Sequence, residues 1–346
     1  MKVLVVNNMA PFVWGGAEEL ALHLQKNLIA AGHQSEVLRL PFQWAPATRI
    51  PSQMLMARAF EIWNVDRVIA LKFPAYLVRH PHKTLWLLHQ YRQAYDLYDA
   101  GQSNLPPGQE GEDIRSLIRN ADNEAVSESR QVFTLSENTR KRLNHYNGLD
   151  AQVLPQPLND PEIFCGGKAE GYIFAGGRIN GMKRQHLLLE ALAQTSSNIR
   201  LVIAGPADSP ADVERLARLA ETFGLNDDRL RIDARFLPRA EIAALVNGAS
   251  ACACLPYDED CLSYVAMEAA CAGKPIISTT DSGGVLGLAR HQETGWVVAP
   301  QPQTLAEAMT QVIAQPARAR DLGASAKTLW NSLGITWPRT IESLLQ

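Results

Sequence analysis

The hydrophobic pattern of the chain repeats one theme, a short apolar run followed by a longer amphipathic stretch. Residues 3–6 form the first run, which is typical of a strand buried in a parallel sheet. Leu20, Leu24 and Leu28 then recur at helical spacing. Residues 37–40 return as an apolar strand. The chain is therefore predicted to open with a β-α-β unit.

The same alternation continues through the first half and starts again at Tyr172. Strands are predicted over residues 67–71, 84–88, 131–135, 172–175, 200–204, 230–232, 251–255, 276–279 and 296–298. Helices are predicted over residues 113–128, 137–146, 185–193, 211–223, 239–247, 304–314, 318–330 and 337–345. Residues 100–112, rich in Gly, Pro, Gln and acidic residues, are predicted to be a mobile surface loop.

Two blocks of strand–helix alternation predict two doubly wound, Rossmann-like α/β domains. A length of 346 residues also exceeds what one hydrophobic core usually holds. Residues 159–170 are interpreted as the linker. We expect a first domain over residues 1–160, with residues 331–346 crossing back to it, and a second over 165–330. Ligands in such sheets bind at the carboxyl ends of strands, so the two domains are expected to face a central cleft.

Composition restricts the class of protein. The net charge of −3 gives no nucleic-acid signature, so we expect no nucleic-acid partner. The five cysteines show no C-x-x-C pair or metal-ligand spacing, which indicates reduced thiols in a cytoplasm. The sequence opens Met-Lys and enters a strand at once, with no signal peptide pattern, and no apolar run is long enough to span a bilayer. We therefore expect a cytoplasmic protein.

The stretch 256–275 carries the strongest chemical signal. An apolar strand runs into the acidic turn Asp258-Glu259-Asp260, and a helix follows that is predicted to begin near Leu262 or Ser263 and to end at Gly273. The first N–H groups of a helix have no partner inside it and attract phosphate. With Asp260 before the helix and a glutamate inside it, this arrangement suits a sugar nucleotide, which has hydroxyls on both sides of a diphosphate.

Two glycine-containing loops also follow predicted strands. Gly177-Arg178 comes after the strand that opens the second half, and Lys183 ends that loop. Gly15-Gly16 precedes the first helix of the chain, where glycine lets the backbone approach phosphate or acceptor. A simple tight turn is the alternative interpretation of this pair. Neither loop is a G-x-G-x-x-G, so dinucleotide binding is only weakly supported.

At these positions the sequence resembles the family 4 retaining glycosyltransferases of the two-Rossmann GT-B architecture. Gly177-Arg178 and Lys183 resemble that family's G-R-x(4)-K motif, and Asp260 to Glu268 its E-x(7)-E motif, with Asp in place of the first Glu. Shorter similarities lie at Gly15-Gly16-Ala17-Glu18, residues 134–139, 273–277, 281–284 and 293–295. The departures are Asp260, Leu262-Ser263 where Phe-Gly is common, residues 156–158 and Gly287.

The resemblance implies roles for single residues. Arg178 and Lys183 would neutralise the leaving diphosphate, aided by the amides of Leu262 and Ser263 and by the backbone at Gly15, Gly16 and Gly177. Asp260 would bind donor-sugar hydroxyls, Glu268 would accept hydrogen bonds from ribose, and His89 would act as a hydrogen-bond donor near the reacting sugar. A structural role for His89 is an equal alternative. No metal or other cofactor is expected, although Asp258-Glu259-Asp260 also spells D-x-D.

We therefore expect a retaining, metal-independent hexosyltransferase-type enzyme of polysaccharide biosynthesis. Its partners would be a nucleotide-sugar donor, bound by the second domain, and a glycan, lipid-linked or small-molecule acceptor, bound by the first. The alternatives are a nucleotide-sugar epimerase of GT-B architecture and a non-catalytic sugar-nucleotide-binding protein. A peripheral contact with the inner face of the membrane is a further expectation. The basic residues considered for it are Arg79, His80, His82, Lys83, Arg140, Lys141 and Arg142.

Overall fold

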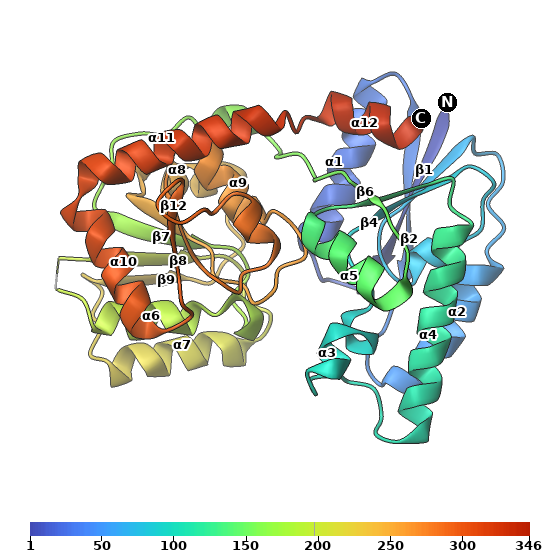
Figure 1. Cartoon of the computed structure of the whole chain (residues 1–346), viewed down its shortest axis with the longest axis horizontal. Coiled ribbons are helices and arrows are strands. Elements are labelled where there is room, and N and C mark those ends of the chain that lie inside the picture. The colour runs from blue at the N-terminus through green and yellow to red at the C-terminus, as the bar shows by residue number, and fades with distance from the viewer. Residues whose placement is uncertain (197) are drawn as a thin grey trace. The chain divides into compact units, whose positions relative to one another are not determined.

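The computed structural model describes residues 1–196 and 198–346, and this part of the chain divides into two compact units (Figure 1). Unit 1 contains Met1–Pro157 together with Thr336–Gln346, and unit 2 contains Leu158–Ile335. In the described residues each unit has one parallel, six-stranded sheet with helices on its faces. The predicted class of two doubly wound α/β domains is therefore confirmed.

The sheet of unit 1 has the strand order β2-β1-β3-β4-β5-β6. The chain reverses its direction of winding between β1 and β3, which are neighbours in this sheet. Valine side chains of β1 with no exposed surface explain why this strand was recognisable from its apolar run. The strands are β1 (Lys2–Met9), β2 (Gln34–Pro41), β3 (Arg67–Ala70), β4 (Lys83–Leu87), β5 (Gln131–Thr134) and β6 (Gln152–Val153).

Some helices of unit 1 differ from the prediction. The helices α2 and α3 were not predicted, and α4 begins at Gln109, so the expected loop 100–112 loses its last four residues to this helix. Gly108, with φ +79°, makes the sharp entry into α4. The α-helices are α1 (Gly16–Ala30), α2 (Ile50–Ala59), α3 (Asp96–Asp99), α4 (Gln109–Ser127), α5 (Glu137–Asn147) and α12 (Trp337–Leu345).

Helix α12, the last of the chain, packs on unit 1. The Trp337 ring meets Trp86 of β4 edge-on, with 6.5 Å between ring centroids. The Thr84 hydroxyl of the same strand donates a hydrogen bond to the Leu344 carbonyl at 3.0 Å. Helix α12 also lies beside α1, as Figure 1 shows. These contacts cover one face of the unit 1 sheet with residues from the other end of the chain.

The sheet of unit 2 has the strand order β12-β11-β10-β7-β8-β9. Counted within the unit, this is the Rossmann order 3-2-1-4-5-6 read from the β9 edge. Its switch point lies between β7 and β10, which are paired in parallel. The strands are β7 (Tyr172–Gly176), β8 (Arg200–Ala204), β9 (Leu230–Asp233), β10 (Ala251–Ala253), β11 (Ile276–Thr279) and β12 (Gly295–Val298).

The α-helices of unit 2 are α6 (Gln185–Ala193), α7 (Pro210–Thr222), α8 (Arg239–Gly248), α9 (Tyr264–Cys271), α10 (Pro302–Ala314) and α11 (Pro316–Leu333). Helix α9 is almost wholly buried, because small residues allow it to lie close against the sheet and α11. None of the helices in the described residues combines the length and hydrophobicity that a bilayer-spanning segment requires.

Candidate functional site

The loops that follow β7, β10 and β11 meet at the carboxyl edge of the unit 2 sheet, at its switch point. The Tyr257 amide, after β10, donates to the Met182 carbonyl of the loop after β7 at 3.0 Å. The Asp258 amide donates to the carbonyl of Asp281, after β11, at 2.9 Å. The structure therefore brings the predicted glycine loop and the predicted acidic turn together. A switch point is where doubly wound sheets bind their ligands.

A close backbone approach explains the glycines at the start of this site. Gly177 has φ +97°, and Ile179, two residues later, forms a parallel bridge with Ala207 of the loop after β8. A Cβ atom built on Gly205 would lie 2.3 Å from the Gly177 carbonyl oxygen. Only glycine at position 205 allows the two loops to approach this closely.

Lys183 of the glycine loop forms an ion pair with Glu259 of the acidic turn. Its backbone is fixed because Lys183 ends a 3-10 turn (Gly181–Lys183) and its amide donates to the Asn180 side chain at 3.0 Å. Burial lowers the pKa of Lys183, but the Glu259 carboxylate outweighs this effect, so the pKa is raised above its ordinary value. The lysine is therefore a half-buried cation, charged at neutral pH and held at the acidic turn.

Arg178 has a different carboxylate partner. Its guanidinium donates to Asp208 at 2.9 Å, and the Asn180 side-chain amide donates to the other oxygen of Asp208 at 2.8 Å. Both members of the Arg178–Asp208 pair are exposed. The two predicted cations thus lie on one loop but are each matched by a separate acidic residue.

Arg184 was not predicted, and it joins three loops of the site. It has left-handed backbone geometry, with φ +53°. Its guanidinium donates to the carbonyls of Leu255 and Pro256, at 2.8 and 3.1 Å, and to both oxygens of Asp281, each at 2.8 Å. The pair lowers the pKa of Asp281. Arg184 therefore links the start of the acidic turn to the loop after β11 through charge-assisted hydrogen bonds.

Backbone pairing also holds the acidic turn. Gly284 donates its N–H to the Glu259 carbonyl at 2.7 Å, and a Cβ atom on Gly283, which has φ +60°, would lie 2.5 Å from the Glu259 nitrogen. Glu259 and Gly283 form an isolated parallel bridge. The glycines of the Asp281-Ser282-Gly283-Gly284 segment therefore permit this close contact, and the backbone of Glu259 is fixed on both sides.

Helix α9 begins one or two residues later than predicted, at Tyr264, with Ser263 as its N-cap. Ser263 has φ 12° and ψ 129°, so the chain is not yet helical there. Its hydroxyl accepts a hydrogen bond from the Cys254 thiol at 3.3 Å and does not cap the helix. The Ser263 amide therefore belongs to the first-turn donors, whereas that of Leu262 precedes them.

Glu268 of α9 is buried, with 3% of its surface exposed, and the Arg239 guanidinium donates a hydrogen bond to it. Burial raises the pKa of Glu268, and Arg239 opposes that shift. Arg239, at the start of α8, also donates to the Asn159 carbonyl at 2.9 Å, and its guanidinium carbon lies 4.7 Å from the centroid of the buried Phe164 ring. The sequence predicted only ribose as a partner of Glu268 and did not identify Arg239.

The Asp258-Glu259-Asp260 sequence was considered as a D-x-D metal motif. Among residues 1–196 and 198–346, no three His, Cys, Asp or Glu side chains converge in a way that would hold a metal ion. In this turn Glu259 instead pairs with a lysine.

The candidate residues of unit 1 lie at the carboxyl ends of β1 and β4. Gly15 is the N-cap of α1 with an extended backbone, φ −157°, and its N–H donates to Glu18 at 3.0 Å. Gly16 is exposed as the first residue of α1. His89 is half-buried, and its Nδ1 lies 2.6 Å from the Gln90 carbonyl oxygen. The extended geometry of Gly15 is open to other residues, so this glycine is not required by its backbone angle.

Two aromatic residues after His89, Tyr91 and Tyr95, belong to the hydrophobic core of unit 1. Tyr91 is stacked on Phe73, with ring centroids 5.3 Å apart, and Tyr95 is fully buried. Tyr95 and Tyr76 each donate a hydrogen bond, at 2.8 Å, to the buried Asp122 carboxylate. Stacking on an acceptor sugar would need exposed rings, so Tyr91 and Tyr95 serve the packing of unit 1.

Two of the basic residues considered for membrane contact are buried. Lys83 is 1% exposed, and its ammonium donates to the carbonyls of Tyr76 and Val78, at 3.2 and 3.1 Å. Burial lowers its pKa to about 8. Arg142 is 7% exposed. These two side chains therefore do not contribute to a membrane-binding surface, because both are buried.

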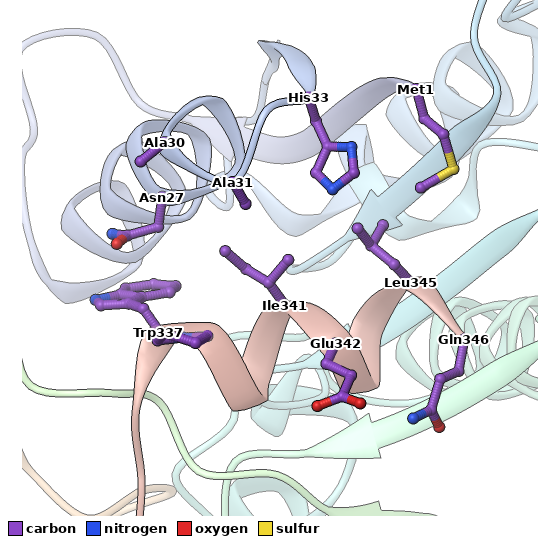
Figure 2. Close-up of a pocket in the computed structure, with 11 residues that line it drawn as sticks. Met1, Asn27, Ala30, Ala31, His33, Trp337, Ile341, Glu342, Leu345 and Gln346 are labelled. Carbon is purple, nitrogen blue, oxygen red and sulfur yellow. The ribbon is translucent and has the colours of Figure 1, made fainter.

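A separate hollow of about 610 Å³ lies in unit 1 between α12 and the end of α1 (Figure 2). Its wall is mainly apolar, with Trp337, Ile341 and Leu345 projecting from α12 and His33 facing them across the hollow. None of the predicted site residues lines it.

Comparison with solved structures defines the fold. The structure is similar to sucrose-phosphate synthase from Thermosynechococcus elongatus, with a TM-score of 0.78, 17% identity, and 99% and 97% of the two chains covered. Anabaena Alr3699/HepE in complex with UDP gives a TM-score of 0.73 at 18% identity, with 99% and 98% covered. WaaG, a glycosyltransferase involved in lipopolysaccharide biosynthesis, gives 0.73 at 16% identity, with the same coverage. The chain has the GT-B fold.

Sequence comparisons narrow the class. Residues 167–329 match the family described as glycosyl transferases group 1. A D-inositol 3-phosphate glycosyltransferase of Rhodococcus opacus (strain B4) is 32% identical over 181 residues, which is 49% of this chain and 39% of that protein. One of Segniliparus rotundus is 22% identical over 334 residues, 88% of this chain and 72% of that protein. The chain thus aligns with about two fifths of the first of these relatives, and the matches support a glycosyltransferase.

Proposed function

We propose that the protein is a retaining glycosyltransferase that moves a sugar from a nucleotide-sugar donor to a glycan, lipid-linked or small-molecule acceptor. The observation that carries this proposal is the contact between Lys183 and Glu259 at the switch point of unit 2. It joins the two motifs that were expected to bind the donor. The match of residues 167–329 to glycosyl transferases group 1, which includes both motifs, supports the same function.

In this proposal the donor diphosphate binds where the glycine loop meets the N-terminus of α9. Negative charge grows on the diphosphate as the anomeric C–O bond breaks, so cations and amides placed there stabilise the transition state. The cations would be Lys183 and Arg178, and the amides would be those of Ser263 and Gly177. Leu262 would position the segment that leads into α9. Asp260 would bind sugar hydroxyls.

The ribose would bind at Glu268. The Arg239 guanidinium already donates to this carboxylate, and the remaining lone pairs of its oxygens would accept hydrogen bonds from the ribose hydroxyls. Arg239 is then a residue that orients Glu268 toward the nucleoside.

Unit 1 would bind the acceptor at the loops that contain Gly15, Gly16 and His89. The imidazole would donate a hydrogen bond near the reacting sugar. The acceptor hydroxyl would attack the anomeric carbon on the face from which the diphosphate leaves, and the departing phosphate would take its proton. This route gives retention and requires no carboxylate nucleophile.

The first experiment is a thermal-shift screen against UDP-, GDP-, ADP- and dTDP-sugars, since a bound donor raises the melting temperature. Transfer from the donor so identified is then followed by NMR of the anomeric proton of the product. Retention supports the mechanism, and inversion overturns it. Activity that survives EDTA supports a metal-independent enzyme, whereas loss that Mg²⁺ or Mn²⁺ restores contradicts it.

The same incubation separates the alternatives. An epimerised nucleotide sugar that appears without any acceptor would favour an epimerase. Donor binding with neither transfer nor slow hydrolysis would favour a non-catalytic binding protein, which the Asp260 substitution motivates. Cytoplasmic location and a role in polysaccharide assembly are parts of the proposal, and flotation with anionic vesicles tests the membrane contact.

A further inference from the structure

The ion pair between Lys183 and Glu259 should weaken the binding of the nucleotide-sugar donor. This inference rests on the proposed function. Lys183 is the cation expected to meet the donor diphosphate, yet its ammonium is already paired with a carboxylate. The ammonium has three N–H donors, but a phosphate brought to it would also lie beside the Glu259 carboxylate and be repelled by that like charge. A phosphate oxygen that contacts Lys183 therefore competes with Glu259.

Both partners of the pair are held in place. Glu259 is bonded through its carbonyl to the Gly284 amide at 2.7 Å and bridged to Gly283. Lys183 is fixed by the bond of its amide to Asn180 at 3.0 Å. The backbones on both sides of the contact are thus fixed, so only the two side chains have to move for the pair to separate.

Burial makes this pair stronger than an ordinary surface pair. Lys183 and Glu259 side chains are 29% and 18% exposed, whereas Arg178 and Asp208 are 44% and 38% exposed. Attraction between charges grows as water is excluded, and exposed pairs contribute little. Competition should therefore be appreciable at Lys183 and small at Arg178.

We propose that Glu259 is the resident counterion of Lys183, and that the donor diphosphate displaces it on binding. The backbone of Glu259 stays fixed while its side chain leaves the ammonium and is replaced by phosphate oxygens. When the nucleoside diphosphate product leaves, the carboxylate returns. Glu259 thus lowers the affinity for donor and product together and assists product release.

The test is isothermal titration calorimetry of wild type and Glu259→Gln with UDP, GDP and ADP, and with inorganic pyrophosphate as a probe without a base. Gln keeps the size of the side chain but removes its charge, so the variant is expected to bind the preferred nucleoside diphosphate about tenfold more tightly. A purely structural role predicts the opposite, because a disturbed site loses affinity. Glu259→Ala, which also removes the charge, should show the same direction of change.

Two comparisons make the result specific. Glu214→Gln removes a carboxylate from an exposed pair with Arg218 on α7, and should leave affinity unchanged. In a Lys183→Ala background, Glu259→Gln should improve binding less than threefold, because no ammonium remains to be released.

The outcomes separate the two proposals. Binding of a nucleoside diphosphate by wild type, with equal or weaker binding by Glu259→Gln, overturns the counterion role and leaves the proposed function standing. Absence of binding by wild type and variants alike overturns the proposed function. Binding gained by Glu259→Gln supports both.

Discussion

The Arg239 guanidinium donates a hydrogen bond to the Glu268 carboxylate and so joins the start of α8 to the middle of α9. The Glu268 side chain is 4% exposed and the Arg239 side chain 34%. A buried carboxylate without a partner is costly, so this pair is a condition for placing Glu268 inside the fold.

Arg239→Met is therefore expected to lower the free energy of unfolding by about 2–4 kcal/mol at pH 8. This loss is slightly smaller than is usual when one partner of a fully buried ion pair is removed, because Arg239 is partly exposed. Burial raises the pKa of Glu268, and loss of Arg239 raises it further. A raised carboxyl pKa means that the folded state keeps a proton that the unfolded chain has released, so stability falls as pH rises. The penalty should thus be smaller at pH 5 than at pH 8 in urea titrations.

Arg218→Met is the control for that experiment. The Arg218 and Glu214 side chains are 68% and 65% exposed in their pair, and exposed pairs contribute about 0–1 kcal/mol. Equal penalties for the two variants, or a penalty for Arg239→Met that does not change with pH, would contradict the account of Glu268.

Gly205→Ala tests the close approach of the loops after β7 and β8. Its Cβ atom would lie 2.3 Å from the Gly177 carbonyl, and position 205 has φ +144°. Relief requires Gly177 to move, so we expect a loss of about 2–3 kcal/mol in stability and weaker nucleoside diphosphate binding. Gly181→Ala is the matched control on the Gly177 loop, because nothing lies within 4 Å of its Cβ position. A Gly205→Ala variant that behaves like Gly181→Ala would show that this approach is unimportant.

The sequence was informative where one local pattern determines the structure. The strands Arg200–Ala204 and Ile276–Thr279 have the predicted bounds, because an unbroken apolar run needs only burial on both faces of a sheet. Helix α2 was missed because Leu55 and Met56 are exposed, which obscures its periodicity. Strand β6 was missed because both of its residues are exposed.

For the site, the motifs were predictable but their partners were not. The Gly177 loop and the acidic turn follow strands at a switch point, which the order of elements already indicates. Arg184 and Arg239 carry no local signal, since their partners lie 71 and 29 residues away along the chain. Their roles follow from how α8, α9 and the loop after β11 pack. The position of Arg184 directly after Lys183 was the one available hint.

Asp122 gives a pH-dependent prediction for unit 1. Its carboxylate is buried between the hydroxyls of Tyr76 and Tyr95, and burial raises its pKa from 3.8 to about 7. The folded state therefore holds a proton between about pH 4 and pH 7 that the unfolded state releases, and stability should fall by about 4 kcal/mol across this window. Asp122→Asn cannot titrate, so its unfolding free energy from urea titrations should decline less steeply between pH 5 and pH 7. Identical slopes for the variant and wild type would refute the raised pKa.

Lys183→Ala and Arg178→Ala test the chemistry of the proposed transfer. Each removes a cation from the loop that would receive the growing charge of the leaving diphosphate, so kcat should fall by roughly a hundredfold. Arg218→Ala on α7, which also removes one positive charge from unit 2, should retain wild-type kcat. Single-turnover rates with saturating donor separate chemistry from binding, and product-inhibition constants report the affinity that remains. A loss below threefold for Lys183→Ala would remove that residue from the transition state, whatever its effect on donor affinity.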